Sequence, residues 1–72
     1  MDKKEKAATL FKAIADLPEN QRIAFTLHKV DGLSYQEVSE VMQTSVSSVE
    51  SLMHRAKTNL KKKLEDYYKD LD

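Results

Sequence analysis

The chain has 72 residues with one Gly, one Pro and no Cys, and its 12 basic residues are balanced by 12 acidic ones. This length permits one domain with a small core, and the absence of cysteine excludes disulfides, thiolate nucleophiles and cysteine-based zinc sites. Because no apolar run could cross a bilayer and the N-terminus lacks a signal-peptide pattern, we expect a cytoplasmic domain with no membrane contact. We also expect no metal and no other cofactor.

The first predicted element is a helix over about residues 4–16. Its apolar residues recur at helical spacing among charged ones, so that one face should pack on the core. These residues are Ala7, Leu10, Phe11, Ile14 and Leu17. Pro18 ends this helix and suits the start of the next one, because the first turn does not need its missing N–H.

A second helix is predicted over about residues 19–30. Arg22 lies opposite the apolar face and is a candidate phosphate contact. His28 lies on the inner side, where a packed histidine with satisfied hydrogen bonds is expected rather than a metal ligand. Gly32 should end the helix in the left-handed conformation. The apolar face consists of Ile23, Ala24, Leu27 and Val30.

A short third helix is predicted over about residues 35–42. Ser34 and Glu37 have the spacing of a capping box, and Leu33 can pack onto Val38 across the helix start. We expect the inward-facing residues of this helix to be Val38, Val41 and Met42.

The last predicted helix covers about residues 46–66 and begins after Ser45, an N-cap candidate. Its apolar residues alternate at three- and four-residue steps: Val46, Val49, Met53, Ala56, Leu60 and Leu64. A short helix, a three-residue turn and a long capped helix form the helix-turn-helix pattern. We therefore predict an all-α fold, a compact four-helix array in which the long C-terminal helix is the recognition helix.

The outer side of this last helix is the candidate DNA-binding surface. At about 100° per residue, its first half turns small hydroxyls and Arg55 away from the core, and such groups can hydrogen-bond to phosphates or base edges. A basic run from Arg55 to Lys63 follows, so local positive charge exists although the net charge is zero. The alternative for this run is a solvated helix face. The candidate DNA-binding residues are Ser47, Ser48, Glu50, Ser51, His54, Arg55, Lys57, Lys61, Lys62 and Arg22.

Four segments together resemble region 4 of extracytoplasmic-function sigma factors: LPENQR from Leu17, GLSYQEV from Gly32, SVSSVES from Ser45 and HRAK from His54. The resemblance covers residues 10–64. It implies a domain that recognises the minus 35 promoter element, docks on the β-subunit flap of the RNA polymerase core and can be masked by an anti-sigma factor. Since such factors also need a separate region 2, the chain is expected to be a single domain excised from a longer sigma factor.

Three residues depart from the pattern of many relatives, which hold Gly, Lys and Arg at the positions of Gln43, Glu50 and Leu52. Gln43 occupies a turn position where a left-handed conformation is usual, and there it would cost about 1 kcal/mol. Glu50 is either an outward charge, which we favour, or an acceptor for cytosine N4. Leu52 either widens the core, which we favour, or contacts a thymine methyl.

Two other interpretations remain open at this point. The helix-turn-helix could belong to a transcription factor of response-regulator type, or the last helix could pair with a second copy as a dimerisation module. No interpretation makes the domain an enzyme.

Overall fold

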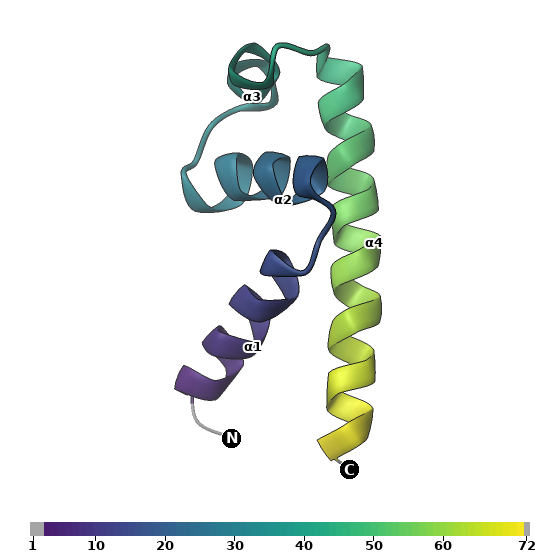
Figure 1. The fold of residues 1–72 in the computed structure, drawn as a ribbon. Coiled ribbons are helices and arrows are strands. Elements are labelled where there is room, and N and C mark those ends of the chain that lie inside the picture. The colour runs from purple at the N-terminus through teal and green to yellow at the C-terminus, as the bar shows by residue number, and fades with distance from the viewer. Residues whose placement is uncertain (1–2, 72) are drawn as a thin grey trace.

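A computed structural model describes the backbone of residues 3–71 and the side chains of residues 8–65. This part of the chain is helical throughout, apart from short connections, and has no strand. Figure 1 shows one long helix with the others stacked along one side of it. The elements are α1 (Lys3–Ala15), α2 (Glu19–Phe25), η1 (Thr26–Val30), α3 (Tyr35–Met42) and α4 (Val46–Leu71).

Helix α4 sets the dimensions of the molecule. Its 26 residues correspond to about 39 Å at 1.5 Å per residue, which accounts for the long dimension of the 41 × 19 × 15 Å Cα envelope. Helices α1, α2 and α3 each pack on α4. The predicted all-α array with a helix-turn-helix and a long C-terminal helix is confirmed, and α4 continues five residues past the predicted end at residue 66.

The second helix differs from the regular helix predicted over residues 19–30, because its last five residues form the π-helix η1. The Asp31 N–H donates to the Thr26 carbonyl at 3.1 Å, and the Leu33 N–H donates to the Leu27 carbonyl at 3.0 Å. Gly32 ends the element with φ 77°, as predicted. A single widened turn shifts apolar spacing by less than one residue, so periodicity could not reveal it.

Two small apolar clusters follow each other along α4. One joins α1 to the middle of α4 and contains Ala13, Ile14, Leu17, Ala56 and Leu60. The other joins α2 and α3 to the first half of α4 and contains Ala24, Val38, Val49 and Met53. Phe25 is partly buried and packs against both clusters. The second cluster fixes the two helices of the helix-turn-helix relative to each other.

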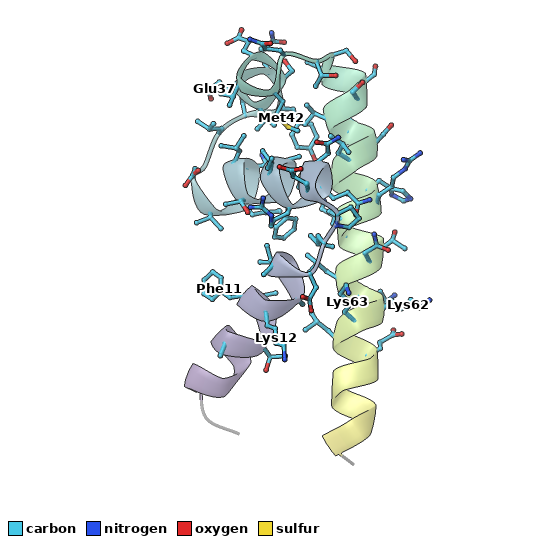
Figure 2. The ribbon with its side chains drawn as sticks, viewed as in Figure 1. Phe11, Lys12, Glu37, Met42, Lys62 and Lys63 are labelled. Atoms are coloured by element: carbon cyan, nitrogen blue, oxygen red, sulfur yellow. The ribbon has the colours of Figure 1, made fainter. Side chains whose placement is uncertain are left out.

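Four large apolar side chains predicted to face the core are instead exposed: Leu10 (40%), Phe11 (60%), Val30 (57%) and Val41 (60%). In α1 only one edge meets α4, through the buried Ala13, Ile14 and Leu17. Figure 2 shows Phe11 on the side of α1 that points away from α4. These predictions were wrong because each of these helices buries only a narrow stripe, and the margins of its apolar face stay exposed. The side chain of Ala7 lies outside the described residues.

Within the described residues, no helix combines the length and the apolar character needed to cross a lipid bilayer.

Candidate nucleic-acid interface

The turn between α3 and α4 holds the two helices at a fixed angle. The Gln43 N–H donates to the Glu40 carbonyl at 3.3 Å, and the Thr44 N–H donates to the Ser39 carbonyl at 2.9 Å. This pair of bonds is the Schellman arrangement, which satisfies carbonyls that the helix end leaves free. It requires Gln43 in the left-handed conformation, with φ 56° and ψ 48°. The strained geometry predicted for Gln43 is therefore present.

Helix α3 begins with the predicted capping box. The Glu37 N–H donates to Ser34 Oγ at 3.1 Å, and the Ser34 N–H donates to Glu37 Oε1 at 3.0 Å. Hydrogen bonds from the backbone N–H of Ser34, and then from its side chain, hold the pKa of Glu37 below its ordinary value of 4.5, because they stabilise the ionised carboxylate. Both partners of the box stabilise the start of α3.

Helix α4 begins at a second side-chain cap, as predicted for Ser45. The Ser48 N–H donates to Ser45 Oγ at 3.1 Å, and Ser45 Oγ also donates to Ser48 Oγ at 2.9 Å. Such a cap satisfies an N–H that the first turn leaves without a helical partner. Ser48 thus takes part in forming the end of α4 that should enter DNA.

The first half of α4 separates an apolar inner side from a polar outer side. Val49 and Met53 are 0% and 1% exposed, whereas the polar residues at the intervening positions lie on the surface. Among the described side chains, those on this outer side are exposed, which is a condition for entry into a groove. A shallow hollow on it is lined by Ser47, Glu50, Ser51, His54 and Arg55. We call these five residues the α4 face.

Three lysines among the candidate DNA-binding residues lie farther along α4. Lys57, Lys61 and Lys62 are all exposed, and in Figure 2 Lys62 projects away from the other helices. Arg22 lies on α2 and is partly buried. The α2 residue that lines a groove beside the α4 face is Asn20, two positions earlier.

This groove contains residues that sequence reasoning did not select. Asn20 and Thr44 are these residues, and they line it together with Leu52 and members of the α4 face. Leu52 is partly buried and also packs against the second cluster, so it contributes to the core and to the groove wall. No sequence signal identifies Asn20 or Thr44, because their position depends on how α2 and the turn meet α4.

His28 has the structural role that the sequence predicts. Its Nδ1 is hydrogen-bonded to the Leu33 carbonyl oxygen at 2.7 Å, so Nδ1 carries the proton. Its ring also lies 4.6 Å from the Tyr35 ring, at an interplanar angle of 57°. Among the described side chains, no three His, Asp or Glu residues gather as a metal site.

The chain is similar to one protein family and to several curated proteins. The profile of the family "Sigma-70, region 4" matches residues 8–60. The ECF RNA polymerase sigma-E factors of Escherichia coli K12 and Salmonella typhimurium LT2 are both 39% identical over 56 residues, which is 78% of this chain and 29% of theirs. The RNA polymerase sigma-H factor of Pseudomonas aeruginosa PAO1 is 41% identical over 58 residues, or 81% of this chain and 30% of that protein. The chain thus spans less than a third of the length of these relatives.

Proposed function

Since the chain belongs to the sigma-70 region 4 family, we propose that it is the promoter-recognising domain of an alternative sigma factor, of the extracytoplasmic-function class. It binds the minus 35 element in transcription initiation, in the cytoplasm, as one domain of a longer sigma factor and without enzymatic activity of its own. The chain is similar to ECF sigma-E factors and corresponds to only 29% of their length, which supports its assignment as one domain of such a factor.

The observation that carries the proposal is the uncovered α4 face. A recognition helix contacts base edges with the N-terminal part that enters the major groove. In this chain Ser47, Ser51 and Arg55 occupy that part and are exposed, while the opposite side is buried in the core. We assign base or phosphate contacts to Ser47, Ser48, Ser51, His54 and Arg55, and contacts with the DNA backbone to Lys57, Lys61, Lys62 and Arg22. Glu50 remains either an outward charge, which we favour, or an acceptor for the N4 amino group of cytosine.

We further propose that the domain docks on the β-subunit flap of the RNA polymerase core and that an anti-sigma factor can mask it. Leu10 and Phe11 on α1 support a protein contact, because they are 40% and 60% exposed. Single exposed apolar side chains are ordinary, whereas contiguous apolar patches mark interaction surfaces, and we take these two neighbouring residues as part of such a patch. They lie on a different helix from the α4 face, so one domain can contact DNA and protein together.

The two other interpretations fit less well. The family match favours a sigma factor over a response-regulator-type protein. A coiled-coil dimer would need the apolar stripe of α4 for a second copy. In this domain Val49, Met53, Ala56 and Leu60 are already buried against α1, α2 and α3.

The test compares three variants on two duplexes: one selected by the chain itself from a random library, and one of the same composition with a shuffled sequence. We expect Arg55→Ala to weaken binding to the selected duplex by about 1–3 kcal/mol if Arg55 contacts a base, and Lys61→Ala to lower the salt slope by about 1 with little change in preference. Lys12→Ala on α1 is the control, with the affinity and slope of the parent chain. Fluorescence anisotropy at several salt concentrations measures all of these quantities. Parental affinity in the Arg55 variant would exclude Arg55 from DNA contact, and an equal loss on both duplexes would mean that Arg55 contacts a phosphate and not a base.

A further inference from the structure

A groove runs between the first turn of α2 and the outward side of α4. Asn20 lines it from α2, Thr44 lines it from the turn, and Ser48, Leu52 and Arg55 line it from α4. Asn20 and Arg55 are both exposed, so their polar groups reach solvent at this groove. The groove adjoins the α4 face and shares Ser47, Ser51 and Arg55 with it.

A hydrogen bond between helices holds the first turn of α2, which carries Asn20, at this groove. Asn59 of α4 donates through Nδ2 to Gln21 Oε1 at 2.7 Å, in a partly buried position. Gln21 is the neighbour of Asn20 in α2, so this bond holds the first turn of α2 against α4. Asn20 therefore belongs to the preformed surface around the recognition helix.

The widths of an α-helix and of the major groove determine which part of the DNA lies at this protein groove when α4 binds. An α-helix with its side chains is about 10–12 Å wide, and the major groove of B-DNA is about 12 Å wide. The helix thus fills the width of the major groove, and its two edges meet the two sugar-phosphate strands. Ser48, Leu52 and Arg55 lie on one edge of α4 at about 100° per residue. Asn20 lies beside that edge, where a strand must pass.

We propose that Asn20 contacts DNA: Asn20 and Arg55 together bind one phosphate of the strand beside this edge. This inference rests on the proposed function. The amide N–H of Asn20 donates to a phosphate oxygen, as amide side chains commonly do in DNA complexes, and the Arg55 guanidinium supplies the positive charge. Because Asn20 is neutral, its contact adds affinity without releasing a counterion.

The test uses the 72-residue chain, the selected duplex and the shuffled duplex, with anisotropy followed over a range of KCl concentrations. Asn20→Ala should weaken binding to both duplexes by the same factor, about tenfold, with the salt slope unchanged. Asn20→Lys should strengthen binding to both and steepen the slope by about 0.9, the value for one additional neutralised phosphate. Ala15→Lys, at an exposed position of α1, is the charge-matched control and should change the slope much less. Circular dichroism checks that each variant keeps its helices.

The outcomes separate this inference from the function on which it rests. Parental binding in Asn20→Ala, together with equal effects of Asn20→Lys and Ala15→Lys, would overturn the phosphate contact while promoter binding stands. A loss in Asn20→Ala confined to the selected duplex would also overturn it, since it would indicate a base contact. If the parent chain enriches no sequence from the random library, the proposed function fails and this inference fails with it.

Discussion

Gln43 carries backbone strain at the turn on which the position of the recognition helix depends. Its φ of 56° lies in the left-handed region, where a residue with a Cβ is disfavoured and Gly is not. We predict that Gln43→Gly removes about 1 kcal/mol of backbone strain. The greater conformational entropy of Gly in the unfolded chain offsets about 0.4–1 kcal/mol of this gain, so the free energy of unfolding should rise by less than about 1 kcal/mol. Urea denaturation at pH 7 measures this change.

Gly32 provides the opposite control for the same effect. Its φ is 77°, and a Cβ added there would meet no atom within 4 Å, so Gly32→Ala introduces backbone strain without a steric clash. We expect this variant to lose about 1 kcal/mol. A stabilised Gly32→Ala or a destabilised Gln43→Gly would show that the left-handed geometry is not what governs these two turns.

Glu37 should make the stability of the domain depend on pH. Its pKa in the folded chain lies below the ordinary 4.5 because of the hydrogen bonds with Ser34. Its contribution is therefore fully present above about pH 4.5 and is lost as the pH falls through the lower folded pKa. We predict that Glu37→Gln, which can still accept the Ser34 N–H, flattens the loss of stability on acidification. Urea midpoints measured from pH 7 to pH 3 test this. A midpoint that falls as steeply with decreasing pH in Glu37→Gln as in the parent chain would refute it.

At the scale of the elements, the hydrogen bond between Asn59 and Gln21 links α2 to α4. A hydrogen bond of this kind contributes about 0.5–1.5 kcal/mol net, so a double-mutant cycle with Gln21→Ala and Asn59→Ala should show a coupling of that size. Thr58→Ala is the neighbouring control, because the Thr58 hydroxyl donates only locally, to the His54 carbonyl. Additive effects of the two alanine variants would mean that the bond does not hold α2 in place.

The elements that the sequence predicts well are those with local start and stop signals. Ser34 with Glu37 marks the start of α3, Ser45 marks the start of α4 and Gly32 marks the end of the second helix, since each acts on backbone groups within a few residues. The π-helical turn and the exposure of Val41 were missed. The exposure of Val41 depends on how α3 packs on its neighbours, which periodicity does not specify. One widened turn changes the apolar spacing too little for periodicity to reveal it.

For the whole molecule, periodicity predicts which residues of α4 are exposed, but it does not predict which residues of other helices lie beside them. The exposure of Ser47, Ser51 and Arg55 follows from their positions in one amphipathic helix, and periodicity is enough to predict it. The groove that brings Asn20 to Arg55 joins residues 35 positions apart, and it needs the packing of α2 on α4. The outward position of Phe11 likewise depends on the narrow contact of α1.

The most direct test is an NMR titration of the isotope-labelled chain, first with the selected duplex and separately with a β-flap fragment. With DNA, we predict the largest amide shifts in residues 47–55 of α4, with smaller shifts around Asn20. With the flap fragment, the shifts should centre on Leu10 and Phe11 of α1. DNA-induced shifts that are largest on α1, or a duplex that leaves residues 47–55 unmoved, would contradict the central claim that the first half of α4 enters the major groove.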